Sequence, residues 1–290
     1  MANLKEIRTR IASVGANMKI TQAMKMVSAS KFKKASDAIT HMRPYSDGLS
    51  QILAQVSSAM SADENIESPY TVVRDVKRVL VVVVTSNKGL CGAFNSNVVK
   101  NVKEMLANAL ADCQVDIMTV GNKGRDLLSK VHAIEADYSY LYDDMTFAAV
   151  SQMTTRIMDD YATEKYDSVW VVYNRFKNAA TQIVTCEQFL PLEIKATQAK
   201  GAAAVGDFIL EPDSKTIIEG LLPQSLRLQM FRVMRDSVAS EHGARMTAMH
   251  KASDNAKELK DRLTLEYNNA RQAAITNQII EIVSGAEALG

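Results

Sequence analysis

The sequence predicts an α/β fold joined to a long antiparallel coiled coil, in which the N- and C-terminal helices pair. Residues 4–60 and 224–289 carry long helical patterns with few interruptions. Between them, strand-like apolar runs alternate with helical patterns and turns, which is typical of a Rossmann-like domain with a mostly parallel sheet. We therefore predict a coiled-coil helix at 1–60, an α/β domain at 70–211 and a second coiled-coil helix at 212–290.

The first helix carries a seam of apolar residues at alternating spacings of three and four, as in a coiled coil. The seam comprises Leu4, Ile7, Ile11, Val14, Met18, Phe32, Ala35, Ile39, Met42, Leu49, Leu53, Val56 and Met60. Polar residues interrupt it at Thr21, Lys25, Ser28 and Ser46. Pro44 lies inside the pattern, and because an internal proline removes a helical hydrogen bond, we expect a bend or break there.

The central part begins with a β-branched run at 76–84, which lacks polar alternation and therefore predicts a strand covered on both faces. Further strands are predicted at Val115–Val120, Ser168–Tyr173 and Thr181–Glu187, and the last two can form a hairpin. Helices are predicted after the first strand, after Gly121–Gly124 and over 146–163. Residues 61–69 are expected to form a linker and residues 195–206 a mobile loop.

In the second long helix, Pro212 and Pro223 flank a short helical piece, and the long pattern follows Pro223 without a further proline. Its seam runs through Leu226, Met230, Val233, Met249, Ala252, Ala256, Leu259, Leu263, Tyr267, Ala270, Ala274, Ile279, Ile282, Ala286 and Leu289. The final stretch, Gln272–Gly290, contains no Lys or Arg. A free helix so apolar around its circumference would aggregate, so we expect an apolar sleeve around it.

Charge and cysteine content limit the classes of function. The net charge of the 290 residues is +1, which gives no overall signal for nucleic-acid binding. Residues 1–43 nevertheless hold nine basic and two acidic residues, which indicates either a solvated face or an acidic partner. The three cysteines are widely spaced, which favours reduced thiols over a disulfide scaffold or a zinc site. We expect neither a membrane span nor a signal peptide.

Catalytic chemistry finds little support in the sequence. The turn Ser86–Ala93 follows a strand and opens a helix, where phosphate can bind, but it matches no phosphate-loop pattern and more often serves only as a turn. Gly121–Arg125 is a similar turn. The four histidines do not cluster, and no nucleophile has a visible base–acid set. Two alternatives stay open: a nucleotide-dependent enzyme using Gly89–Gly92, and a free-standing coiled-coil scaffold or homodimer.

Five motifs in order along the whole chain resemble the gamma subunit of the rotary F-type ATP synthase. They are Ile20–Lys31, Gly89–Asn95, Ser240–Met246, Leu265–Thr276 and Ile282–Leu289. The resemblance implies a non-catalytic rotor shaft that couples proton or sodium flow to ATP synthesis or hydrolysis. It implies three alpha and three beta subunits, the epsilon subunit and the membrane c-ring as partners, with one copy of this chain and no nucleic acid. It also implies a peripheral location on the cytoplasmic side of the bacterial membrane. This chain would bind no cofactor or metal, and ATP, ADP and Mg would bind to partner subunits.

The resemblance also implies partner-contact residues. Lys25, Lys31, Lys33 and Lys34 would face acidic loops of the beta subunits, and Met24 and Arg245 would lie at a contact important for coupling. Arg271 and Gln272 would bind a beta-subunit loop, while Ile275, Ile279, Ile282, Val283 and Leu289 would turn in an apolar collar. Gly89–Asn95 would be a structural turn. Gly243 departs from the small helix formers usual at its position and should weaken the helix by up to about 1 kcal/mol relative to Ala. No regulatory cysteine pair is visible, so we expect no redox switch.

Overall fold

The computed structural model describes residues 4–59, 68–192 and 214–287. The chain forms two compact units, one of residues 1–29 with 245–290 and one of residues 30–244. We call these the helical unit and the sheet unit. Two long helices, α1 (Leu4–Ala59) and α5 (Ser214–Glu287), contribute to both. The predicted domain boundaries stay a prediction, and the loop predicted at 195–206 lies outside the described residues, as does most of the predicted linker.

The sheet unit is built on five strands in the order β3-β2-β1-β4-β5. Their bounds are β1 (Arg78–Val84), β2 (Gln114–Val120), β3 (Ile134–Asp137), β4 (Ser168–Phe176) and β5 (Gln182–Leu190). β1 is parallel to β2 and β4, β2 is parallel to β3, and only β5 is antiparallel to its neighbour. The prediction of a mostly parallel sheet ending in a hairpin is confirmed.

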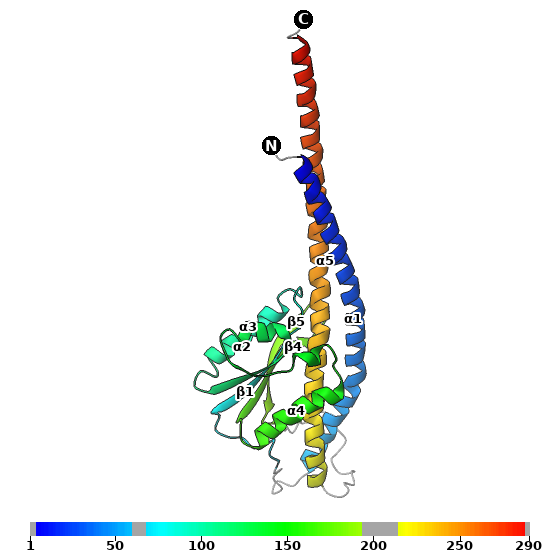
Figure 1. Ribbon diagram of the computed structural model, residues 1–290. Helices are drawn as coiled ribbons and strands as arrows, with labels where there is room; N and C mark the ends of the chain where they lie inside the picture. The colour runs from blue at the N-terminus through cyan, green and yellow to red at the C-terminus, as the bar shows by residue number, and fades with distance from the viewer. Residues whose placement is uncertain (1–3, 60–67, 193–213, 288–290) are drawn as a thin grey trace. The chain divides into compact units, whose positions relative to one another are not determined.

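The two faces of β1 belong to two different cores, and Val79 to Val84 are all 0% exposed. Leu80, Val82 and Val84 pack in the core that includes residues of α4 (Phe147–Ala162) and α5. The alternate valines pack in the core that includes residues of α2 (Phe94–Ala107) and α3 (Asn122–Leu128). Figure 1 shows the sheet between these helices. Burying each of these side chains contributes about 1.5–3 kcal/mol, so the run predicted as a doubly covered strand anchors this unit.

β3 and the short helix η1 (Ser139–Tyr142) were not predicted. β3 has only four residues, and its side chains alternate between half-buried and exposed. Because it is a short edge strand carrying Glu135 and Asp137, it lacks the apolar run that marks a buried strand.

The two long helices pack against each other in both units. In the sheet unit, Ala35 and Ile39 of α1 form a buried cluster with Ala239 of α5, and Leu53 packs beside Leu222. Later residues of α1 therefore meet earlier residues of α5, which makes the pair antiparallel, as predicted. In the helical unit, Ile7 and Leu263 are 7% and 8% exposed, and most other seam residues as far as Ala274 are half-buried.

Both long helices pass through a proline without interruption. Of the bend or break expected at Pro44, the break is absent, because α1 is continuous from Leu4 to Ala59. α5 begins at Ser214, close to the predicted boundary at 212, and continues through Pro223. A proline leaves the carbonyl four residues earlier without its helical donor. Those carbonyls belong to Thr40 and Glu219, which are exposed, so water can satisfy them.

Candidate functional site

The C-terminal part of α5 exposes apolar side chains over several turns. Ile275, Ile279, Ile280, Ile282 and Val283 are between 48% and 71% exposed. Within the helical unit, α5 continues beyond the start of α1, so nothing described in this chain covers these residues (Figure 1). No basic residue follows Arg271. An apolar and nearly uncharged surface of this kind is typical of a protein-binding site. Leu289, also predicted for this site, lies outside the described residues.

The other predicted contact residues of the helical unit differ in exposure. Arg271 and Gln272 are exposed, Met24 and Lys25 are half-buried, and Arg245 is only 9% exposed. Burial within the chain already restrains the Arg245 side chain. Their roles as partner contacts stay predictions.

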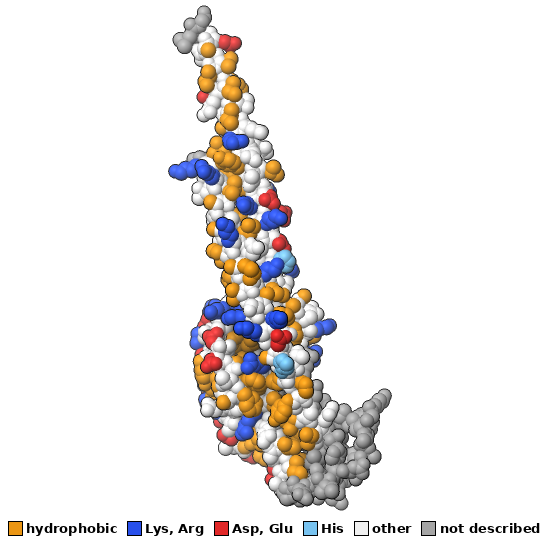
Figure 2. Space-filling model, turned by 90° about the vertical axis from the view of Figure 1, so that its right-hand side faces the viewer, with side chains coloured by type: hydrophobic (Ala, Val, Ile, Leu, Met, Phe, Trp, Pro, Cys, Tyr) orange, Lys and Arg blue, Asp and Glu red, His pale blue; other side chains and the backbone are white. Residues whose placement is uncertain are grey.

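Three predicted contact residues of the sheet unit, Lys31, Lys33 and Lys34, are exposed on α1. Figure 2, which looks onto the α1 side, shows several basic side chains close together on this face. Within the described part of the chain, none of the three lysines forms an ion pair. Three unpaired cations within one helical turn favour an anionic partner.

The polar interruption of the seam places a hydrogen bond between the two helices of the helical unit. The hydroxyl oxygens of Thr21 and Ser253 lie 2.8 Å apart. Nearby on α1, the Ser28 hydroxyl donates to the Met24 carbonyl at 2.7 Å. The sequence pattern identified Thr21 and Ser28 but missed Ser253, because serine beside Ala252 reads as the flank of an apolar seam.

The Gly89–Asn95 turn is an internally bonded loop packed against α5. The Asn95 side chain accepts from the Ser86 amide at 2.9 Å and donates to the Ser86 hydroxyl at 2.8 Å. Cys91 and Phe94 form a buried cluster with Ala244 of α5. α5 residues therefore occupy space beside the loop, and this geometry favours a structural turn over a nucleotide site.

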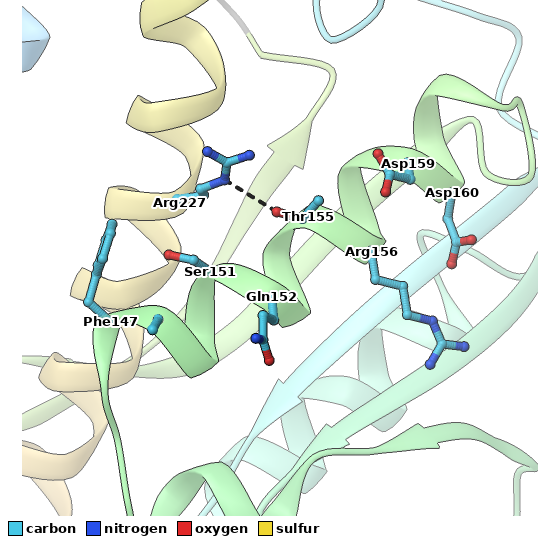
Figure 3. Close-up of a pocket in the computed structure, with 9 residues that line it drawn as sticks. Phe147, Ser151, Gln152, Thr155, Arg156, Asp159, Asp160 and Arg227 are labelled. Carbon is cyan, nitrogen blue, oxygen red and sulfur yellow. Dashed lines mark hydrogen bonds between the residues drawn. The ribbon is translucent and has the colours of Figure 1, made fainter.

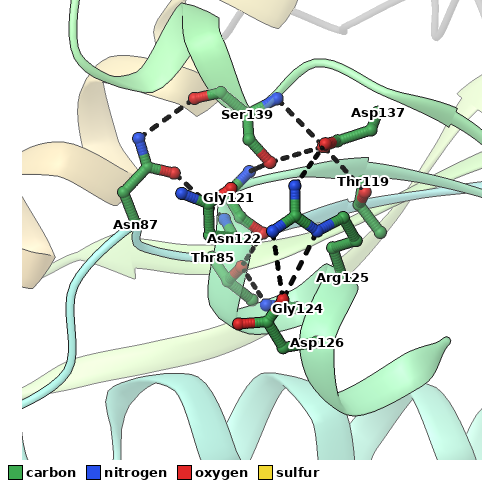
Figure 4. A network of polar contacts seen from close by, with 10 residues as sticks. All are labelled: Thr85, Asn87, Thr119, Gly121, Asn122, Gly124, Arg125, Asp126, Asp137 and Ser139. Carbon is green, nitrogen blue, oxygen red and sulfur yellow. Dashed lines mark hydrogen bonds and ion pairs between the residues drawn. The ribbon is translucent and has the colours of Figure 1, made fainter. Parts of the chain in front are cut away.

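The second candidate phosphate turn, at the start of α3, has its backbone donors committed. The amides of residues 121 to 124 donate in turn to the Ser139 hydroxyl, the Asn87 side chain, the Ser86 carbonyl and the Thr85 hydroxyl, at 2.8–3.2 Å. Figure 4 shows most of these contacts. Gly121 has a φ of 114°, and a Cβ there would collide with the Thr85 carbonyl oxygen. The amides that would hold a phosphate are thus already bonded within the protein.

Asp137 supports this turn as an anion. Burial alone would raise the pKa of its carboxyl group, but hydrogen bonds from Ser139, Arg125 and Thr119 hold that pKa below its usual value. The Arg125 guanidinium lies 3.0 Å from the Asp137 carboxylate. The network therefore stabilises the edge of the sheet at neutral pH.

The Ser240–Met246 motif contributes buried polar side chains that the sequence did not indicate. Ser240 and Glu241 are 0% and 4% exposed on α5. Burial raises the pKa of the Tyr142 hydroxyl well above its usual value, and the negative charge of the neighbouring Glu241 raises it further. Tyr142 is thus held neutral where η1 meets α5.

A cavity of about 660 Å³ lies between α4 and α5 in the sheet unit. Figure 3 shows Arg227 of α5 pointing to Thr155 of α4, to which it donates a hydrogen bond at 3.3 Å. Phe147 and Ser151 line the same cavity. This lining lacks a nucleophile with an adjacent base, so it does not form a catalytic set.

The described part of the chain offers neither a metal site nor a membrane span. Within residues 4–59, 68–192 and 214–287, no group of three or more His, Cys, Asp or Glu side chains could hold a metal ion. None of the helices in these ranges is both long and apolar enough to span a bilayer. In the same described ranges, Cys91, Cys113 and Cys186 form no disulfide bond.

Comparison with known proteins gives full-length matches. The family model described as ATP synthase matches residues 3–289. A protein named ATP synthase gamma chain from Flavobacterium johnsoniae is 52% identical over 289 residues, covering 100% of this chain and 99% of the relative. A protein of the same name from Christiangramia forsetii is 53% identical with the same coverage.

Solved structures show the same fold. The central stalk and c-ring structure of the Tetrahymena thermophila mitochondrial ATP synthase contains a chain that is 26% identical, with a TM-score of 0.58. The match covers 81% of this chain and 99% of the other. A chain in the rotor of the Euglena gracilis mitochondrial ATP synthase is 22% identical with a TM-score of 0.66, covering 94% of this chain and 98% of that one.

Proposed function

Because the chain belongs to the ATP synthase gamma-chain family, we propose how its surfaces serve the rotary enzyme. The chain is the central rotor shaft of the F-type ATP synthase and is a non-catalytic subunit of that enzyme. What remains to assign is which surface meets which partner.

The exposed apolar part of α5 turns in an apolar collar formed by a ring of three alpha and three beta subunits. Its uncovered side chains at Ile275–Val283 are the observation that carries this assignment. A collar without charged groups would exclude water from them without fixing one orientation, because apolar contacts are non-directional. Rotation in such a socket breaks no ion pair.

The basic surface of α1, at Lys31, Lys33 and Lys34, faces acidic loops of the beta subunits, and Arg271 and Gln272 meet a beta-subunit loop. The sheet unit lies beside the epsilon subunit and the c-ring. The assembly holds one copy of this chain and is peripheral to the membrane on the cytoplasmic side. ATP, ADP and Mg bind at the partner subunits.

The helix pair transmits a bias rather than performing chemistry. The helix pair is asymmetric, because its two helices differ in sequence. In any one orientation it therefore presents a different set of side chains to each of the three surrounding catalytic sites. A ligand or partner shifts a conformational equilibrium only by its differential affinity for the two states. Turning the shaft therefore changes nucleotide affinity at each site in sequence, and the coupling is reciprocal.

Native mass spectrometry of the assembly that co-purifies with the chain tests this assignment. We expect one copy of this chain with three copies each of two ring subunits. A stable homodimer of the chain without ring subunits would instead support a free-standing scaffold and overturn the proposal.

A further inference from the structure

The turn between β4 and β5 places a basic residue beside the basic surface of α1. Exposed Lys177 follows Phe176, the last residue of β4. The ring centroids of Phe176 and Phe32 lie 5.6 Å apart, so the end of the hairpin packs on α1. Lys31 and Lys33 flank Phe32 in the chain. The ring contact therefore brings the backbone that carries Lys177 close to the backbone that carries these two lysines.

The turn itself is held in one conformation by its own side chains. The Asn178 side-chain oxygen accepts from the amides of Ala180 at 3.0 Å and Thr181 at 2.7 Å. The Gln182 side chain donates to the Ala179 carbonyl at 3.1 Å. A turn ordered in advance presents its neighbouring side chains at a lower entropic cost on binding.

Gly243 of α5 allows the same turn to approach the helix pair. A Cβ at this position would lie 3.0 Å from the Ala179 carbonyl oxygen and 3.4 Å from the Phe32 ring. The turn, α1 and α5 thus meet at one point of the sheet unit. Packing, rather than a flexible linker, fixes where the turn stands relative to α1.

The two segments that meet here are strongly basic. Residues 30–40 and 174–182 together contain Lys31, Lys33, Lys34, Arg175 and Lys177 and one acidic residue, Asp37, for a net charge of +4. Within the described residues none of the five basic side chains forms an ion pair, whereas Lys165 and Arg125 in the same unit do. Clustered cations repel one another, and a partner of opposite charge relieves that repulsion.

We propose that Lys177 joins Lys31, Lys33 and Lys34 in one surface that binds an acidic peptide segment of a partner subunit. The inference rests on the proposed function, which supplies a protein ring around the shaft. A peptide fits better than a single-stranded nucleic acid, because the two half-buried aromatic rings at this surface, Phe32 and Phe176, pack on each other instead of standing free to stack on a base. Phe176 also packs against the buried Ala35, Ile39 and Ala239. The surface thus extends from α1 onto the hairpin.

Zero-length carbodiimide cross-linking of the whole assembled complex tests contact directly, because it joins a lysine amine only to a carboxylate that touches it. We expect a cross-link from Lys177 to an acidic stretch of a ring subunit, found by peptide mass spectrometry. Lys177→Arg keeps the charge but removes the amine, so this cross-link should disappear while the complex assembles normally. Cross-links from Lys177 only to this chain, or none at all in an assembled complex, would overturn the inference.

Charge reversal at Lys177 provides a quantitative test of the same inference. Lys177→Glu should weaken binding of the full chain to the ring by about two- to fivefold at low ionic strength, the range of an exposed ion pair. The difference should vanish at about 1 M salt, where screening acts within a few ångströms. Lys103→Glu, a change at another exposed lysine of the sheet unit, is the matched control. Equal effects of the two reversals would contradict the inference about Lys177 but leave the proposed function intact. A wild-type chain that binds no ring at all would contradict both.

Discussion

At Gly243, the low helix propensity of glycine is set against the close approach of a neighbouring turn. Its low helix propensity predicts a gain of up to about 1 kcal/mol on replacement by Ala. In the structure, however, the added Cβ would press on the Ala179 carbonyl oxygen at 3.0 Å and the Ala179 Cα at 3.2 Å. At Gly220, in the same helix, an added Cβ would meet nothing within 4 Å.

We therefore expect Gly220→Ala to raise the free energy of unfolding by about 0.5–1 kcal/mol, and Gly243→Ala to gain less or to lose stability. Urea denaturation followed by circular dichroism compares the two. Equal gains from both substitutions would show that the turn yields easily and that glycine is not needed for the approach.

Ile279 and Ile282 test the apolar surface of α5. Replacing both by Lys should weaken binding of the chain to the alpha–beta ring by more than about tenfold, because burying each isoleucine contributes about 1.5–3 kcal/mol. Binding can be titrated with a labelled full-length chain. Val131 and Val73, 61% and 81% exposed in the sheet unit, provide a control pair of Lys substitutions. A control pair as damaging as the test pair would contradict a role specific to this segment.

Asp137 predicts a pH dependence of stability. Its folded-state pKa is depressed, so the ionised carboxylate stabilises the fold above its unfolded value of about 4. That contribution is lost as the pH falls through the folded-state value. Asp137→Asn should cost about 1 kcal/mol at pH 7 and progressively less in acid, as measured by urea unfolding at several pH values. Asp126→Asn, which removes only an exposed partner of Arg125, is the control. A cost that does not change with pH would contradict the prediction.

At the scale of elements, the polar part of the α1 seam favours torsional flexibility of the helix pair. Thr21 pairs with Ser253 by a hydrogen bond, and Lys25 is half-buried on the same seam. Polar side chains at seam positions pack less tightly across a helix interface than Leu or Ile would. Changing Thr21, Lys25 and Ser28 to Leu or Ile should stiffen the helix pair, which single-molecule rotation measures as lower torsional compliance. Unchanged compliance would defeat this hypothesis.

The sequence predicted most elements because their patterns are local. The run at Val79–Val84 identified a strand covered on both faces, and the seam residues identified both long helices. Where the prediction failed, the local sequence pattern did not contain the feature that determines the structure. Pro44 and Pro223 lie inside continuous helices, and the residues whose carbonyls lose a helical donor, Thr40 and Glu219, are exposed, so water can satisfy those carbonyls. β3 was missed because a four-residue edge strand has no apolar run to signal it.

At the scale of the whole molecule, the candidate surfaces were predicted unequally. The end of α5 could be predicted from composition, since an apolar helix segment without basic residues after Arg271 is unusual in this chain. The individual contacts at Met24, Arg245 and Gln272 came only from family resemblance, and they stay predictions. Lys177 could not have been assigned from the sequence, because only the packing of Phe176 on Phe32 brings its turn to α1.

The most direct test of the central claim is rotation of the chain within its complex. A bead attached at Lys103→Cys, an exposed site of the sheet unit, reports the angle of the shaft while the ring is fixed to a surface. The account predicts that ATP drives the bead in one direction in steps of a third of a turn, as three catalytic sites require. A ring that hydrolyses ATP while the bead stays at one angle would contradict it.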